Sequence, residues 1–287
     1  MSAAARALHC TPSAVSQQLK ALQHEVGLPL TERVGRGLRL TPVGAELAER
    51  AVDVAVAMRR AEAACDVFRA RPTGTVSVAA FQSAAQMLFP GVLRRLAAEP
   101  AIVVEVHDQD VAQEDFPALA ADHDIVVAHR PDLTHGWAAS VLVLPLLREP
   151  LDVALPVGHR LADRVRLRPA DLLDESWIAV RVGFPLAAVL DAIGRSAGAA
   201  PRVVQRINDF HVVEALVAAG HGISLLPRFT ADHRDGSRFR LVPLDGVPAS
   251  REIDALVRPD RAERLVVGRV LDALRAEAAL VGGAATG

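Results

Sequence analysis

The sequence predicts an α/β protein in three successive parts, and three observations predict this fold class. A short segment with closely spaced helix-capping residues and arginines comes first. One long amphipathic helix pattern follows over residues 42–69, and alternating strand and helix patterns fill the rest of the chain. The length of 287 residues allows about two domains of ordinary size, and a hydrophobic content of 51% suffices for buried cores.

The charge is unevenly distributed along the chain. Residues 1–41 hold five basic residues against two glutamates, a balance of +3, so the remainder of a chain with net charge −2 carries −5. A small basic head on an acidic body is the electrostatic pattern of a nucleic-acid-binding protein, although charge alone is a weak indication.

The sequence argues against a membrane protein, a disulfide-stabilised protein and a metal-binding protein. No apolar run reaches the roughly 18 residues of a membrane-spanning helix, and residues 1–9 lack the apolar core of a signal peptide. We therefore expect a cytoplasmic protein with no membrane partner. Cys10 and Cys65 are too few for a disulfide framework and too far apart for a metal knuckle, so we expect no metal and no cofactor.

The head predicts two consecutive helices. Residues 2–9 predict a short helix with Ser2 as its N-cap. Thr11 followed by Pro12 predicts a second helix start, and this helix runs to about residue 25, with Gly27 as its C-terminal cap. The apolar face of the second helix recurs at helical spacing and consists of Val15, Leu19, Leu22 and Val26.

A polar stripe runs along the opposite side of the second helix. Its members follow the spacing i, i+3, i+4, i+7 and are Ser13, Ser16, Gln17 and Lys20. Side chains of this kind suit base edges and phosphates in a major groove. Taken alone, such a stripe is more often a solvated helix face, and the neighbouring segments decide between the two interpretations.

A basic hairpin is predicted after this helix. Two short segments flank Gly35 and Gly37, and the arginines on or beside the tip are Arg33, Arg36 and Arg39. A basic hairpin at this place is typical of the wing of a winged helix-turn-helix, where arginine contacts phosphate or enters the minor groove. The alternative is an exposed polar hairpin without a ligand.

The long helix predicts a dimer. Apolar residues recur every four and three positions over about three heptads, at Leu47, Ala51, Val54, Met58, Ala61, Cys65 and Phe68. A seam of this kind pairs two helices in a coiled coil. Cys65 is interpreted as a small apolar residue of the seam, with a disulfide across the dimer as the alternative.

Beyond residues 71–74, a hinge-like linker, the pattern is that of an α/β domain. Strands are predicted at residues 75–80, 102–107, 124–128, 141–144, 151–155, 177–180, 203–207, 222–226 and 253–257. Helices are predicted at residues 84–98, 186–196, 210–219 and 261–278.

Six segments together resemble the LysR-type transcriptional regulators. Residues 3–23 (AAARALHCTPSAVSQQLKALQ) are similar to the helix-turn-helix signature of that family, and GLPLTER at 27–33 and LTPVG at 40–44 to its wing and linker start. LLREPL at 146–151 with LPVGHRL at 155–161 resembles the crossover into the second effector subdomain. VEALVAAGHGISLLP at 213–227 resembles a helix-then-strand unit near the end, so the likeness spans essentially the whole chain.

The resemblance implies a winged helix-turn-helix head, a linker helix and an effector domain of two subdomains, like a periplasmic binding protein. The expected boundaries are 1–41 for the head, 42–71 for the linker and dimerisation helix, and 72–287 for the effector domain. Within the effector domain, subdomain I is expected over 75–146 and 249–287, and subdomain II over 147–248.

Two departures from the family pattern stand in the head. Family members usually begin with another helix ahead of the equivalent of Ser2, so we expect an amino-terminally shortened, partial head. A misplaced start codon is the preferred explanation, and a truly truncated protein is the alternative. Thr31 occupies a position that is usually aromatic in the family, which puts the packing of the wing in doubt.

An effector is expected outside the carboxyl ends of the strands, between the subdomains. Ser83 opens a helix whose free amides attract anions, and Arg181 suits a carboxylate, so we expect a small effector, and an anionic one would suit both groups. Helix capping alone and a solvated arginine are the alternatives. The expected effector-binding residues are Phe81, Gln82, Ser83, Arg130, Arg181, Val182, Asp209 and Phe210.

The sequence holds no G-x-S-x-G, P-loop or H-E-x-x-H motif, and we expect no enzyme. His107 and His123 are expected to meet in space as a structural pair. The predicted function is a sequence-specific regulator that binds double-stranded DNA as a homodimer or homotetramer under small-molecule control. Its rivals are a sensor whose shortened head no longer binds DNA by itself, and an enzyme on a periplasmic-binding-type fold.

Overall fold

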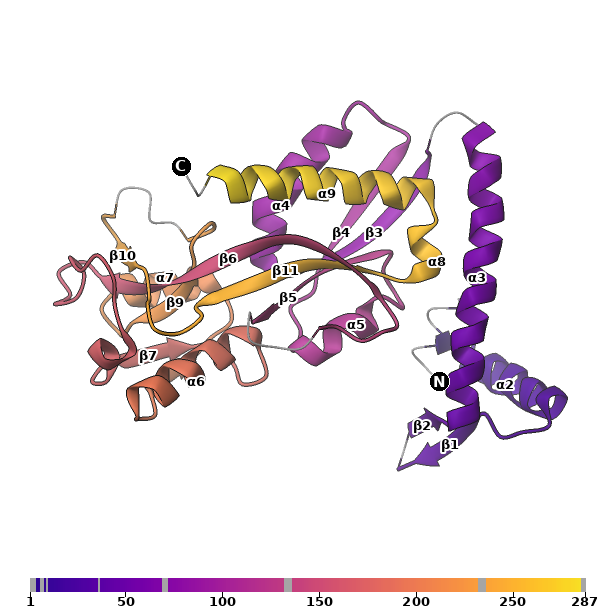
Figure 1. Ribbon diagram of the computed structural model, residues 1–287, viewed down its shortest axis with the longest axis horizontal. Coiled ribbons are helices and arrows are strands. Elements are labelled where there is room, and N and C mark those ends of the chain that lie inside the picture. Colours follow the sequence, from indigo (N-terminus) through magenta and orange to yellow (C-terminus); the bar gives the residue numbers. More distant parts are fainter. Residues whose placement is uncertain are drawn as a thin grey trace.

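The computed structural model describes residues 4–5, 8, 10–35, 37–68, 72–131, 136–231 and 236–284. A small head lies at one end of a long helix, and a larger two-lobed body lies beside the other end (Figure 1). The predicted helix at residues 2–9 falls mostly outside the described residues, although positions 4 and 5 are helical. The elements of the head and linker are α2 (Pro12–Val26), β1 (Thr31–Val34), β2 (Gly37–Leu40) and α3 (Pro42–Phe68).

Both predicted ends of α2 are confirmed. The Thr11 hydroxyl accepts a hydrogen bond from the Ala14 amide at 3.2 Å, and this satisfies a first-turn donor. Gly27 adopts a left-handed φ of 72°, which favours glycine at a helix C-cap. Val15 and Leu19 of the predicted apolar face are half-buried, whereas Leu22 and Val26 are exposed.

The wing is an antiparallel hairpin in which Thr31 pairs with Leu40. The side-chain oxygen of Gln23 on α2 accepts from the Leu30 amide at 2.9 Å, the Thr31 amide at 3.1 Å and the Thr31 hydroxyl at 3.2 Å. These three bonds tie the wing to α2, so Thr31 is accommodated by polar contacts where an aromatic side chain would pack.

The linker helix contacts both the head and the body. A Cβ added at Gly44 would lie 2.0 Å from the Leu30 carbonyl oxygen, so the close approach of α3 to the head requires glycine. Toward its other end α3 packs beside α8 (Pro259–Ala262), where Arg60 pairs with Glu263 at 3.0 Å (Figure 1).

The first lobe of the body is a sheet covered by helices. Strands β3, β4 and β5 are parallel and β11 is antiparallel to β5. Helices α4 and α9 lie together on one face of the sheet, and α5 lies on the other (Figure 1). The elements are β3 (Gly74–Ala80), α4 (Gln82–Leu96), β4 (Ile102–Asp108), η1 (Gln113–Asp115), α5 (Phe116–Leu119), β5 (Ile125–Pro131), β11 (Ser250–Val257) and α9 (Leu265–Ala284).

Two long strands cross from the first lobe into the second. β6 (Leu142–Pro156) is one continuous strand of 15 residues, so the prediction of separate strands at 141–144 and 151–155 was wrong. Pro145 and Pro150 lie between the two predicted segments, and proline cannot donate a hydrogen bond to a neighbouring strand. Instead, the pairing with β11 shifts register beside Pro145, and the strand continues through this bulge.

The second lobe surrounds the far half of β6. β9 and β10 pair with that half on its two sides, and β7 and β8 form a separate parallel pair. β10 was not predicted; it adds a short edge strand in which Phe239 and Val242 are buried. The elements are η2 (Pro169–Leu172), β7 (Ser176–Ala179), α6 (Pro185–Ala197), β8 (Arg202–Arg206), α7 (Phe210–Ala218), β9 (Ser224–Pro227) and β10 (Phe239–Val242).

The two lobes are separate units because each has its own hydrophobic core. Val78, Leu88 and Ile125 lie at the centre of the first core. Leu155 and Trp177 lie at the centre of the second. In the part of the chain that the structure describes, no helix is long and apolar enough to cross a membrane.

Candidate functional site

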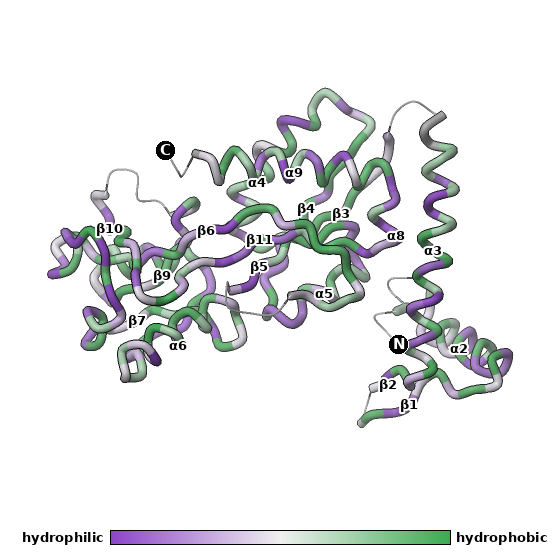
Figure 2. The backbone as a smooth tube through the Cα atoms, in the orientation of Figure 1, coloured by the Kyte–Doolittle hydropathy of each residue, from purple (hydrophilic) through white to green (hydrophobic). Residues whose placement is uncertain are grey.

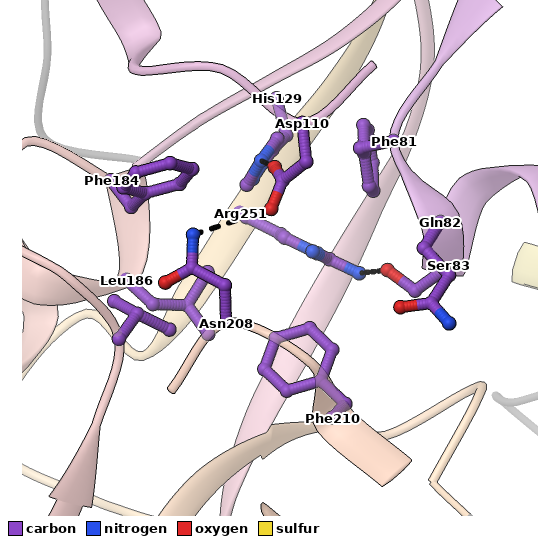
Figure 3. A pocket seen from close by; sticks show the side chains of 11 residues that line it. Phe81, Gln82, Ser83, Asp110, His129, Phe184, Leu186, Asn208, Phe210 and Arg251 are labelled. Atoms are coloured by element: carbon purple, nitrogen blue, oxygen red, sulfur yellow. Dashed lines mark hydrogen bonds and ion pairs between the residues drawn. The ribbon is translucent and has the colours of Figure 1, made fainter. Parts of the chain in front are cut away.

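A pocket lies where the two lobes meet beside the crossing strands (Figure 3). It holds about 360 Å³ of space without atoms and is partly open to solvent. Only about 30 Å³ of this space admits a water-sized sphere, so a ligand larger than about two water molecules requires the lobes or the lining side chains to move apart. The lining residues are Phe81, Gln82, Ser83, Asp110, His129, Val180, Phe184, Leu186, Asn208, Phe210 and Arg251.

The amino terminus of α4 forms one wall of the pocket. β3 ends at Ala80, and Phe81 stands at the N-cap in an extended conformation without a capping bond from its side chain. The first-turn amides of Gln82 and Ser83 are therefore not capped by Phe81, and such amides favour an anionic group.

Arg251 lies at the centre of the site and is 1% exposed. Its guanidinium donates to one Glu149 carboxylate oxygen through Nε at 2.9 Å and Nη2 at 2.6 Å. Nη2 also donates to the Ser83 hydroxyl at 2.7 Å. The guanidinium carbon lies 4.9 Å from the Phe81 ring centre and 6.0 Å from that of Phe210. Arg251 therefore joins α4, the crossing strands and α7.

His129 is a buried imidazole on the pocket wall. Neither of its ring nitrogens has a hydrogen-bond partner among the described residues, and its ring packs 4.2 Å from that of Phe81. The Asp110 carboxylate lies 3.9 Å from Nε2, which is too long for a hydrogen bond. Burial, reinforced by the charge of Arg251, lowers the pKa of His129 to about 4 despite Asp110, so the imidazole is neutral at pH 7.

One polar contact closes the pocket between the lobes. Asn208, which precedes α7 of the second lobe, donates from its amide to the Asp110 carboxylate of the first lobe at 3.4 Å. The Asn208 side-chain oxygen in turn accepts from the Arg181 amide at 2.9 Å. A ligand that contacts Asp110 would therefore lie at a junction of the two lobes.

The structure brings together four of the eight predicted effector residues: Phe81, Gln82, Ser83 and Phe210. Asp209 stands next to the pocket and caps α7 by accepting from the His211 amide.

The other three predicted effector residues lie outside the lining. Arg130 pairs with Asp254 at 3.0 Å in the sheet. Arg181 lies exposed over the Phe184 ring, and Val182 is 76% exposed.

Several residues that line the pocket were not predicted from the sequence. Asp110 follows β4 and His129 lies in β5, so both stand near carboxyl ends of parallel strands and the rule used for Ser83 applied to them as well. Arg251 lies on β11, which runs antiparallel to the parallel strands. The rule that ligands bind at the carboxyl ends of parallel strands therefore does not predict it. Val180, Phe184 and Leu186 contribute the apolar wall of the second lobe.

The polar stripe on α2 faces outward in the head. Ser13, Gln17 and Lys20 are exposed, and Ser16 is half-buried. Arg33 on the wing is exposed, and Arg39 pairs with Glu32 at 2.7 Å. Arg36, the third predicted contact to DNA on the wing, lies outside the described residues.

Most of the described side chains in the predicted seam of α3 are exposed. Val54 is 61% exposed and Met58 is 62% exposed, and Ala51, Ala61 and Cys65 are also exposed. Hydrophobic and hydrophilic residues alternate along this helix (Figure 2). An exposed stripe of this length on a single helix is available to a second helix.

The predicted histidine pair is confirmed away from the pocket. The ring centres of His107 and His123 lie 4.9 Å apart, and the Ser77 hydroxyl lies 2.7 Å from Nδ1 of His123. Burial, followed by the charge of His107, lowers the pKa of His123. Among the described residues, no group of three histidine, cysteine, aspartate or glutamate side chains is placed to hold a metal ion.

A helix-turn-helix with a basic wing, joined by a long helix to a two-lobed domain with a small polar pocket, defines a ligand-responsive DNA-binding regulator. Comparison with known families agrees. Residues 69–279 match the LysR substrate binding domain, and residues 1–45 match the bacterial regulatory helix-turn-helix protein, lysR family. The chain belongs to the LysR family of transcriptional regulators, and it is not an enzyme.

Individual relatives support the assignment. The chain is 28% identical to the regulator CbbR of Xanthobacter flavus, over 87% of this chain and 74% of that protein. It is 31% identical to the regulator TtuA of Agrobacterium vitis, over 79% and 75%. A full-length OxyR variant from Pseudomonas aeruginosa shares the fold with a TM-score of 0.66 at 21% identity, covering 95% of this chain and 88% of that one.

Proposed function

We propose that this regulator reads its operator with the exposed stripe of α2 and responds to a small molecule held in the pocket around Arg251. The observation that carries this proposal is the coexistence in one chain of an outward polar helix face and a pocket in which both ring nitrogens of His129 are buried without a hydrogen-bond partner among the described residues. The roles of individual residues in DNA binding and effector binding, given below, are part of the same proposal.

In the proposed complex, α2 lies in the major groove of double-stranded DNA. Ser13, Ser16, Gln17 and Lys20 contact base edges or nearby phosphates. Arg33 and Arg36 hold the sugar–phosphate backbone from the wing. Uncharged stripe residues supply sequence discrimination, and the cations supply salt-dependent affinity.

The exposed seam of α3 supports a homodimer, or a homotetramer built from such dimers. Pairing two α3 helices would place two heads over two half-sites. The proposed parts are the head over 1–41, the linker helix over 42–71 and the effector domain over 72–287. Its subdomain I takes 75–146 and 249–287, and its subdomain II takes 147–248.

The pocket supports a mechanism for the response. Arg251 contacts Ser83 of the first lobe and stacks near Phe210 of the second, and Asn208 bridges to Asp110. A ligand that replaces these contacts changes the relative stability of lobe arrangements. Because α3 is tied to the first lobe through Arg60 and Glu263, a shift of lobes in an oligomer would alter the spacing of the heads.

Footprinting of the DNA upstream of the protein's own gene tests the proposal. We expect two protected half-sites separated by one helical turn of about 10 base pairs, or a multiple of it. Protection that shows no sequence preference, or no protection at all, would overturn the assignment of α2 as the reading helix.

A further inference from the structure

The pocket combines charges and acceptors in a way that defines the chemical class of its ligand. Arg251 is the cation of the lining, and its charge is already paired with Glu149 behind it. Asp110 is the anion of the lining, and it is partly exposed. Arg251, Glu149 and Asp110 together carry a formal charge of −1, so a simple anion would meet net repulsion.

His129 adds a second requirement. Both ring nitrogens are buried without hydrogen-bond partners among the described residues, which costs free energy unless a ligand or water satisfies them. A neutral imidazole offers one acceptor nitrogen and one donor nitrogen. Next to the Asp110 carboxylate, an acceptor nitrogen completes a pair of acceptors suited to a protonated amine.

The opposite part of the pocket suits a carboxylate. The first-turn amides of α4 are not capped by Phe81, and the Ser83 hydroxyl and the Arg251 guanidinium lie beside them. Figure 3 shows Ser83 at the guanidinium end of Arg251, with Asp110 and His129 grouped on another side of the same side chain. A donor-rich area and an acceptor-rich area therefore face one small cavity.

We infer that the effector is an α-amino acid, with its carboxylate at Ser83 and the start of α4 and its ammonium group between Asp110 and His129. This inference rests on the proposed function, because it specifies the ligand of the same pocket. The rings of Phe81, Phe184 and Phe210 then surround the remainder of the molecule. It also refines the expectation of a small effector with an anionic group to that of a zwitterion.

Isothermal titration calorimetry of the full chain, with amino acids and with analogues that lack one charged group, tests the inference. The probes are the twenty protein amino acids and, for each that binds, the 2-hydroxy acid and the amine with the same side chain. We expect at least one amino acid to bind, and removal of either its amino group or its carboxylate to weaken binding by about 10- to 100-fold, as loss of a charged hydrogen bond does.

Asp110→Asn identifies the subsite. This variant should lose about 10- to 100-fold in affinity for the amino acid while its affinity for the 2-hydroxy acid stays within about threefold, so the discrimination between the two disappears. The matched control Asp163→Asn, an exposed carboxylate on the body, should leave both affinities unchanged. Circular dichroism and thermal unfolding verify that each variant is folded.

The outcomes separate the ligand class from the function. If only carboxylates without an amine bind, or if Asp110→Asn retains the discrimination, the amino-acid inference is wrong although the pocket remains an effector site. If none of the twenty amino acids binds, the inference is equally overturned. Failure of the footprinting experiment, which needs no ligand, would instead count against the proposed function.

Discussion

Arg251 and Glu149 form an ion pair of 2.6 Å in which the two side chains are 1% and 0% exposed, at the point where β11 and β6 cross between the lobes. The second Glu149 oxygen accepts from the Phe229 amide at 3.1 Å, at the end of β9. One buried carboxylate therefore holds the central arginine of the pocket and a loop of the second lobe. The pair therefore contributes both to the stability of the fold and to the geometry of the pocket.

Replacing Glu149 by glutamine should destabilise the protein by about 3–5 kcal/mol, because it leaves a buried guanidinium without its counter-charge. Urea unfolding of the purified variant measures this change. The exposed pair of Arg166 and Asp245, at 2.8 Å, provides the control. Asp245→Asn should cost less than about 1 kcal/mol. Equal costs for the two variants would contradict the description of the Arg251 pair.

His129 should make the stability depend on pH. Its folded pKa of about 4 lies below its ordinary value of 6.5, so the unfolded chain binds a proton that the folded chain rejects. This contribution favours folding fully above pH 6.5 and is lost as the pH falls toward 4. Between pH 7.5 and pH 5 the loss amounts to about 2 kcal/mol.

The variant His129→Gln isolates that contribution. Its free energy of unfolding should fall less than that of the parent chain between pH 7.5 and pH 5, by about 2 kcal/mol. His221→Gln, on an exposed turn, should follow the parent. Parallel curves for all three proteins would show that His129 titrates as it does in the unfolded chain.

Gln17 and Arg33 should affect DNA binding in different ways. Gln17→Ala should reduce discrimination between operator and altered sequence by about 1–3 kcal/mol at constant salt. Arg33→Ala should weaken binding to all DNA sequences alike. The plot of log affinity against log salt concentration should also become shallower, by about 0.9 for each phosphate that the side chain no longer neutralises. Fluorescence anisotropy with operator and scrambled duplexes measures both quantities.

Arg164→Ala is the control for the loss of a positive charge, since Arg164 is exposed on the body away from the head. It should leave both discrimination and slope unchanged. If Gln17→Ala changed the salt slope alone, or Arg33→Ala changed only sequence preference, the assigned roles would have to be exchanged.

The seam of α3 should determine the oligomeric state. Val54→Asp would place a carboxylate within the proposed helix pair and should weaken the dimer by about 10-fold or more. Val165→Asp, at a body position that is 85% exposed, should not. Sedimentation equilibrium measures the dissociation constants. A parent chain that is monomeric at micromolar concentration would rule out the seam as a strong interface.

The head and the linker were accessible from sequence because their signals are local. Thr11, Gly27 and Gly35 act within a few residues: Thr11 caps α2, and Gly27 and Gly35 adopt positive φ angles. The crossing strand β6 was less accessible and was predicted as two separate strands. Only the bulge against β11, a contact between distant segments, shows how the strand continues.

Four of the eleven residues that line the pocket were predicted from the sequence, again from local signals. Ser83 and Phe210 follow parallel strands, and their position at a carboxyl end is readable from strand order. Arg251 reaches the pocket from an antiparallel strand. Its position depends on an ion pair with Glu149, which is about a hundred residues away in sequence. Arg130, an arginine equally plausible in sequence, is engaged instead by Asp254.

The central claim is that this chain binds its operator specifically through its head. Titration of the 287-residue protein against the DNA upstream of its own gene and against a scrambled duplex, over 50–200 mM salt, tests it most directly. We expect the upstream DNA to bind at least about 10³-fold more tightly than the scrambled duplex, and both affinities to fall steeply with salt. Equal affinity for the two duplexes at every salt concentration would contradict the claim.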